Sequence, residues 1–134
     1  MKKIIFLISI LFSQIVCADA LIFTGIPSVR ISEGGNDRVV EQIKKAKKIE
    51  FSCVIKEVDG KYFWETRGNK QLVKIDTEGF VTFIAGDGSG YIRMIKPELK
   101  ELTSRMSSTE KDYDYVEHLL IGLRNVTYYG QSKW

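Results

Sequence analysis

The sequence is poor in the residues that build covalent or metal-bound frameworks, with two cysteines, two prolines and one histidine among 134 residues. Cys17 lies in an apolar N-terminal segment, so Cys53 has no partner for an intramolecular disulfide once that segment is removed. Cys53 alternates with Phe51 and Ile55, which places its thiol on the apolar face of a strand. We therefore expect a buried, unreactive Cys53 in a domain that folds without a disulfide.

Motifs for metal binding, phosphate binding and nucleophilic catalysis are also missing. The glycine-rich segment 86–90 is followed by Tyr-Ile-Arg, whereas a phosphate loop ends in Gly-Lys-Ser/Thr and opens a helix. Asp87 and Ser89 are its two candidate calcium ligands, with no later carboxylate at the required spacing. One histidine and one buried cysteine do not make a zinc site. We expect a flexible hairpin loop at 86–90, and neither a metal nor a cofactor.

Positive charge is in small excess, with 20 Lys and Arg against 17 Asp and Glu. Nucleic acids and anionic membranes select proteins with clustered positive charge. The basic cluster of this chain, at residues 44–48, fits the solvated face of a short helix. The charge balance therefore predicts no nucleic-acid partner.

The N-terminus carries the three parts of a secretory signal peptide. Two lysines precede the apolar run Ile4–Val16, and small residues follow it. This run is shorter than the roughly 20 residues that span a bilayer. We expect a signal peptide over residues 1–18, cleaved after Ala18 or Ala20, and one β-rich domain over 19–134. Lipidation of the cysteine in this segment is an alternative. The predicted location is periplasmic or secreted, with no transmembrane segment after processing.

The centre of the chain has the pattern of an antiparallel meander. Five short apolar segments are separated by turn residues, which is typical of strands joined by hairpins. Asp59-Gly60 supplies the positive φ angles of a tight two-residue turn. The predicted strands are Ile49–Val58, Lys61–Thr66, Gln71–Asp76, Phe80–Ala85 and Tyr91–Lys96.

The flanking segments are harder to assign. Leu21–Ile31 contains a proline, which predicts an edge strand or an extended arm. Apolar spacing predicts a short helix over Asp37–Lys47 and a helical turn or two over Pro97–Met106. Segment 113–129 suits a strand or bent strand pair that closes the sheet, with a helix as the alternative. The expected class is α+β, mainly β: a curled or barrel-like meander of five to seven strands with one or two short helices.

Aromatic and arginine side chains gather near the ends of two predicted strands. A guanidinium beside an aromatic ring can stack on it and hold a carboxylate with two donors. If the two strands curl toward each other, these side chains line one mouth. The predicted ligand-binding residues are Trp64, Arg67, Tyr91 and Arg93.

The alternative functions are a small cell-envelope hydrolase and a structural envelope component. A hydrolase would use Glu65 or Glu117 as acid or base, with His118 as the one histidine available. The neighbours Glu117 and His118 point to opposite faces of a strand, or about 100° apart on a helix. Neither arrangement lets the adjacent pair act together easily.

A signal peptide followed by a small, cysteine-poor meander resembles in outline the periplasmic inhibitor and binding modules of Gram-negative bacteria. The cysteine pairs common in periplasmic lysozyme inhibitors are absent, and no motif ties the chain to one family. We expect a non-enzymatic exported binding domain whose partner is an unknown protein, peptide or small ligand of the cell envelope.

Overall fold

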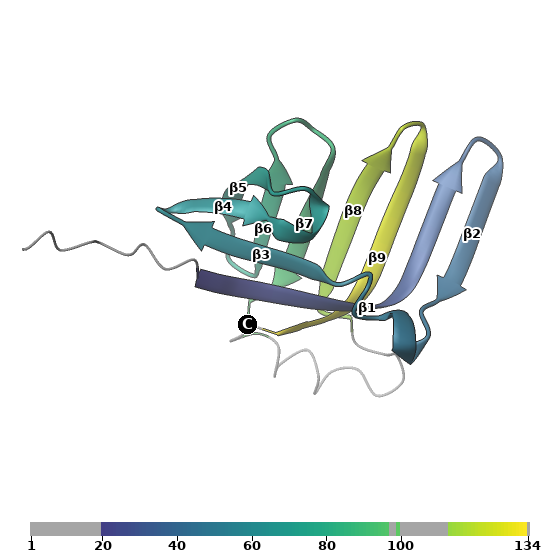
Figure 1. The fold of residues 1–134 in the computed structure, drawn as a ribbon, viewed down its shortest axis with the longest axis horizontal. Helices are drawn as coiled ribbons and strands as arrows, with labels where there is room; N and C mark the ends of the chain where they lie inside the picture. The colour runs from purple at the N-terminus through teal and green to yellow at the C-terminus, as the bar shows by residue number, and fades with distance from the viewer. Residues whose placement is uncertain (1–19, 97–98, 100–112, 134) are drawn as a thin grey trace, which may run out of the picture.

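Nine antiparallel strands make up a single sheet in the computed structural model, which describes residues 20–96, 99 and 113–133 (Figure 1). The strands are β1 (Ala20–Gly34), β2 (Asp37–Gln42), β3 (Cys53–Val58), β4 (Lys61–Trp64), β5 (Lys70–Asp76), β6 (Phe80–Ala85), β7 (Gly90–Ile95), β8 (Tyr115–Ile121) and β9 (Arg124–Lys133). From β3 to β9 each strand pairs with the next, and β1 closes the ring by pairing with both β3 and β9. The sheet is thus an eight-stranded closed meander barrel, with β2 as an extra strand beside β1.

The hairpins follow the turn chemistry of the sequence. Asp59 and Gly60 have φ angles of 51° and 75°, and Val58 pairs with Lys61, so the predicted two-residue turn is confirmed. The meander is confirmed with shifts of a few residues at most strand ends. Segment 113–129 belongs to the strand pair β8 and β9, whose turn contains Gly122 at a φ of 61°. The strand interpretation of that segment is also confirmed.

The helix predicted over Asp37–Lys47 is wrong. Residues Asp37–Gln42 form β2, because the two-residue turn Gly35-Asn36 folds the chain back onto β1 and the β-branched Val39 and Val40 suit a strand. Within residues 20–96 and 113–133, helical structure is limited to the 3₁₀ turns η1 (Lys45–Lys47) and η2 (Glu65–Arg67), so the class is all-β. The other predicted helical segment, Pro97–Met106, lies outside the described residues except for Leu99.

The prediction of an edge strand or arm near the N-terminus is wrong as well, since β1 lies between other strands on both sides. Its first part, Ala20–Gly25, pairs with β3, and its last part, Val29–Gly34, pairs with β2. Pro27 occupies the gap between these two ladders, where its missing N–H interrupts neither. On the other side, the β1–β9 register shifts between Pro27 and Val29. Figure 1 shows β1 bending so that its second half runs beside β2.

Apolar side chains fill the interior of the barrel. Alternation along each strand sends one residue in two inward, and the largest fully buried side chains include Trp64, Phe23 and Phe83. The cluster also contains Cys53, which has no exposed surface, as the strand-face prediction requires. A core of this kind leaves ligand sites to the ends and the outer surfaces of the barrel.

Candidate functional site

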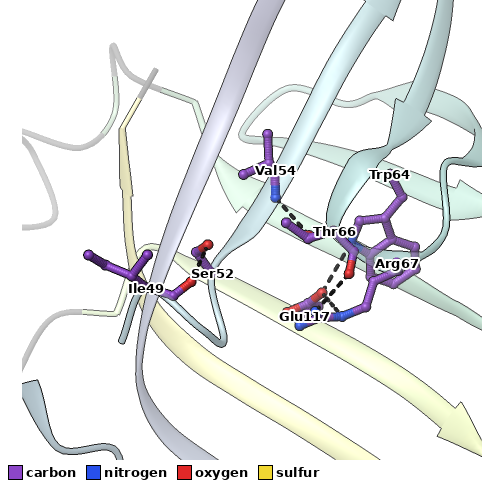
Figure 2. A network of polar contacts seen from close by, with 7 residues as sticks. All are labelled: Ile49, Ser52, Val54, Trp64, Thr66, Arg67 and Glu117. Carbon is purple, nitrogen blue, oxygen red and sulfur yellow. Dashed lines mark hydrogen bonds and ion pairs between the residues drawn. The ribbon is translucent and has the colours of Figure 1, made fainter. Parts of the chain in front are cut away.

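A carboxylate is buried among these apolar side chains. Glu117 lies on β8 between the inward-facing Tyr115 and Leu119, and none of its surface is exposed. Trp64 Nε1 donates a hydrogen bond of 3.0 Å to Glu117 Oε1, and Arg67 Nη2 donates one of 3.0 Å to Oε2. Arg67 Nε lies 3.0 Å from Oε1 in an ion pair, although its N–H makes no hydrogen bond. Figure 2 shows the three side chains converging.

The turn after β4 brings the arginine to this carboxylate. Trp64 ends β4, and η2 follows directly, closed by Gly68 at a φ of 73° and Asn69 at a φ of 53°. Thr66 Oγ1 accepts a hydrogen bond of 3.1 Å from the backbone N–H of Val54, which attaches η2 to β3 (Figure 2). The turn therefore has a fixed position at one end of the barrel.

Burial dominates the electrostatics of this cluster. It raises the pKa of Glu117 to about 7, while the charge and hydrogen bonds of Arg67 act in the opposite direction. Burial also raises the pKa of the Cys53 thiol, with the nearby Glu117 as a further cause. The carboxylate is thus poised to titrate near neutral pH, and the thiol stays protonated.

The aromatic ring of Tyr128 connects this buried cluster to a second group of polar residues. The guanidinium of Arg67 lies 5.6 Å from the centre of the Tyr128 ring, and that of Arg30 lies 6.0 Å from it. Phe51 stacks on Tyr128 with ring centres 5.9 Å apart, and Arg30 is 5.7 Å from the Phe51 ring. Two aromatic rings therefore support the Arg30 guanidinium.

We call the surface beside Arg30 the arginine groove. It is a hollow of about 210 Å³ lined by Arg30, Ser32, Val39, Glu41 and Arg124. Arg124 Nη1 donates a hydrogen bond of 2.8 Å to Ser32 Oγ, and Arg30 Nη1 lies 3.9 Å from Glu41 Oε2. Arg30 Nε is buried and has no hydrogen-bond partner among the residues that the structure describes. Two guanidinium groups and a hydroxyl thus converge on this space together with the Glu41 carboxylate, which an incoming anion would have to displace.

Comparison with protein-family models, curated proteins and solved structures found no match. Within the described ranges, no three His, Cys, Asp or Glu side chains come together as potential metal ligands. Those ranges also contain no helix with the length and apolar character needed to cross a membrane.

The four predicted ligand-binding residues fall into two separate pairs. Trp64 and Arg67 contact the buried carboxylate of Glu117. Tyr91 and Arg93 lie on the outer face of β7, where alternation places them opposite to the buried residues. Arg93 lies 4.2 Å from the centre of the Phe80 ring. The structure does not bring the four to one mouth, and a binding role for the outer pair stays a prediction.

The three candidate acid and base residues are also separated. Glu117 points inward, whereas His118 points outward, stacks on Tyr91 and has Nδ1 3.0 Å from Thr127 Oγ1. Glu65 is on η2 and forms an ion pair of 2.8 Å with Lys56. Both oxygens of the Glu117 carboxylate are engaged by Trp64 and Arg67, so a substrate proton has no open acceptor there.

Ser89 of the glycine-rich segment contacts Lys70 of β5, a pair that the sequence pattern did not connect. Lys70 Nζ donates a hydrogen bond of 2.7 Å to Ser89 Oγ, the spacing of a nucleophile and its base. Asp87 Oδ2 lies 3.0 Å from the same ammonium group. Hydrogen bonds from Ser89 and then from Lys70 hold the pKa of Asp87 far below its usual range. Lys70 Nζ thus donates to Ser89 and pairs with Asp87, and these contacts fasten the loop to β5.

Sequence reasoning missed both arginines of the groove. Arg30 lies two residues after the bulge of β1 and pairs with the inward-facing Tyr128. A strict alternation from Phe23 would have placed Arg30 on the outer face. The presence of Pro27 was the available signal of an irregular strand, but it does not indicate on which side the extra residue falls.

Proposed function

We propose that this protein is an exported, non-enzymatic binding domain that holds an anionic group of its partner in the arginine groove. The observation that supports this most strongly is the state of Arg30. Its guanidinium is supported by two aromatic rings, its side chain is about one third exposed, and its buried Nε has no hydrogen-bond partner within the described residues. A partner carboxylate or phosphate would accept hydrogen bonds from the exposed part of this guanidinium.

The surroundings of Arg30 favour ligand binding over a purely structural role. The rings of Phe51 and Tyr128 restrict the guanidinium before any ligand arrives, so less conformational entropy is lost on binding. Its ion pair with Glu41, at 3.9 Å, is of the partly exposed kind that contributes about 0–1 kcal/mol. An incoming anion can therefore compete with Glu41 for this arginine.

Binding is also favoured over hydrolysis by the placement of the acid and base candidates. Glu117 is enclosed, His118 is on the opposite face of the same strand, and Glu65 is paired with Lys56 on the surface. General acid–base catalysis needs such groups within hydrogen-bond reach of one substrate. The separation of the three supports a protein that holds its ligand without changing it.

An Arg30→Ala variant tests the groove. In a titration with inorganic phosphate or citrate, followed by the backbone amide signals, we expect the wild-type shifts to gather on β1, β2 and the start of β9. Removing the guanidinium should weaken this binding by about tenfold to a hundredfold, because hydrogen bonds to charged groups contribute about 1.5–3 kcal/mol.

Arg93→Ala is the matched control, since it removes the same charge and the same kind of contact with an aromatic ring from the outer face. Unchanged affinity in Arg30→Ala would overturn the proposed site. Loss of affinity in Arg93→Ala instead would move the site to the outer pair, Tyr91 and Arg93, that the sequence analysis suggested.

Export is tested separately by the mass of the protein. The signal-peptide pattern predicts that protein recovered from the periplasm or the medium begins at Asp19 or Leu21. Intact-mass measurement distinguishes these two starts from each other and from lipidation at Cys17. Retention of Met1 in protein from a cell-envelope fraction would contradict the export part of the proposal.

A further inference from the structure

The outer edge of β2 is unpaired in the part of the chain that the structure describes. β2 comes first in the strand order and pairs with β1 alone. All six of its residues are exposed, including Val39 at 53% and Val40 at 57%. Exposed edges offer backbone donors and acceptors to another strand, and proteins usually protect them. The edge of β2 lies directly beside the arginine groove, which Val39 and Glu41 help to line.

The hairpin pattern shows which backbone groups of β2 are free. Ile43 N donates to Ser28 O at 2.9 Å, so residues 28 and 43 form a hydrogen-bonded pair at the end of this ladder. Such pairs alternate with non-bonded ones in antiparallel sheets. Residues 37, 39 and 41 therefore turn their N–H and C=O groups toward β1. Those of Arg38, Val40 and Gln42 point away from the sheet, where another strand can pair with them.

A strand added at this edge would extend the floor of the groove. Val39 lies opposite Ser32, whose hydroxyl accepts the hydrogen bond from Arg124. An added residue opposite Val39 would share its face and lie about 10 Å from β1, two strand spacings away. Arg30 of β1 pairs with Glu41 on β2 at 3.9 Å, and Arg124 of β9 reaches across β1 to within 4.0 Å of the Asp37 carboxylate on β2. An acidic side chain on the added strand would therefore compete with Glu41 and Asp37 for these two arginines.

We infer that the partner of this protein is an extended acidic peptide segment that adds to β2 as a strand and places a carboxylate in the arginine groove. The inference rests on the proposed function, which it makes more specific. Backbone pairing to the β2 edge supplies sequence-independent affinity, and the groove selects the acidic side chain. The chemistry requires an extended segment, because helical backbone groups are already paired.

A second copy of β2 is the competing occupant, and it fits less well. Two-fold antiparallel pairing keeps the same faces together, so the register centred on Val39 sets Asp37 against Glu41. Like charges directly opposite each other destabilise a sheet. The register centred on Val40 pairs residues 38–42 alone. We expect that contact to bury far less accessible surface than the roughly 1,200 Å² or more that specific interfaces bury.

The test uses a synthetic peptide, acetyl-Thr-Val-Thr-Glu-Thr-Val-Thr-amide, and its analogue with Gln in place of Glu. We expect the acidic peptide to bind and to shift the amide signals of Arg38, Val40 and Gln42. Val40→Pro removes an outward N–H that β1 does not use, and should weaken binding at least about tenfold. Val40→Ala keeps that N–H and should bind nearly as wild type. The Gln peptide should bind about tenfold more weakly and be insensitive to Arg30→Ala.

Methylation of the peptide's own backbone nitrogens provides a test that does not alter the protein, and it should abolish binding if a ladder forms. Equal affinity of the methylated and unmethylated peptides would overturn the inference. Binding of inorganic phosphate without binding of the peptide would leave the proposed function standing and overturn the strand addition. A dimer that forms without peptide and is lost in Val40→Pro would assign the edge to a second copy instead.

Discussion

Replacement of Arg67 by methionine is expected to lower the free energy of unfolding by about 1.4 kcal/mol more at pH 8 than at pH 5, because a carboxyl with a pKa near 7 can protonate when it loses its counter-ion, at about 1.4 kcal/mol per pH unit. Arg67 is the counter-ion of Glu117, whose side chain is completely enclosed. Methionine keeps much of the side-chain volume, so the change isolates the charge from the packing. The remaining hydrogen bond from Trp64 does not neutralise the carboxylate.

The size of this effect should depend on pH, with a defined sign. Burial raises the pKa of Glu117 from 4.5 to about 7, so the folded protein holds a proton that the unfolded chain has released between these values. The resulting stabilisation is present in full below pH 4.5 and is lost as the pH rises to 7. At pH 5 the carboxyl is neutral, so loss of Arg67 should then cost only its packing and its hydrogen bonds.

Urea unfolding of wild type and Arg67→Met at both pH values measures the two differences. Arg93→Met is the control, and we expect it to change stability by no more than about 0.5 kcal/mol because its side chain lies on the surface. Glu117→Gln should flatten the pH dependence of the wild type. An equal loss at pH 5 and pH 8 in Arg67→Met would mean that Arg67 stabilises the fold through packing, not through its charge.

Gly130→Ala should prevent the barrel from closing. Gly130 lies on β9, paired with Pro27 of β1 on one side and Tyr115 of β8 on the other. A Cβ added there would overlap the carbonyl oxygen of Ile26 and the Cα of Pro27. Both are backbone atoms in a paired strand, so neither can move away without breaking the β1–β9 ladder. We expect a loss of about 3 kcal/mol or more, the upper end of overpacking costs.

Gly86→Ala is the matched control, because a Cβ at Gly86 meets nothing within 4 Å and its backbone angle is not of the kind that requires glycine. Thermal unfolding followed by circular dichroism compares the two variants. We expect Gly86→Ala to melt within a few degrees of wild type and Gly130→Ala to melt far lower or to be unfolded. A Gly130→Ala protein as stable as its control would show that the strands at this seam are not held as closely as the structure indicates.

Local signals in the sequence predicted the part of the fold that depends on neighbours along the chain. Asp59-Gly60 required a tight turn, and apolar alternation placed Cys53 inside. The segment from Asp37 failed because Val39 and Ile43 fit a helical spacing and a strand equally well over so short a stretch. The segment forms a strand because it pairs with β1, and this pairing cannot be read from the local sequence pattern.

The candidate site was less predictable, because it is built from contacts between distant residues. Glu117 was singled out as an acid or base, but its pairing with Trp64 and Arg67 joins residues about fifty positions apart. Nothing in one sequence shows such a contact. Arg30 was missed because a single extra residue in β1 reverses the inward and outward sets beyond it.

The seam between β1 and β9 has a consequence for how the chain reaches its fold. The two strands pair across about one hundred residues of sequence, the kind of non-local contact that slows folding. A nascent chain that has reached the end of β8 can form its hairpins, but the edge of β1 that pairs with β9 stays unpaired. Phe23 and the other core residues near it then lie on a sheet that has not closed. Until residues 124–133 have been synthesised, the edges of β1 and β8 have no strand to pair with, and such unpaired edges promote aggregation. Synthesis of the last strand is therefore the event that protects the first.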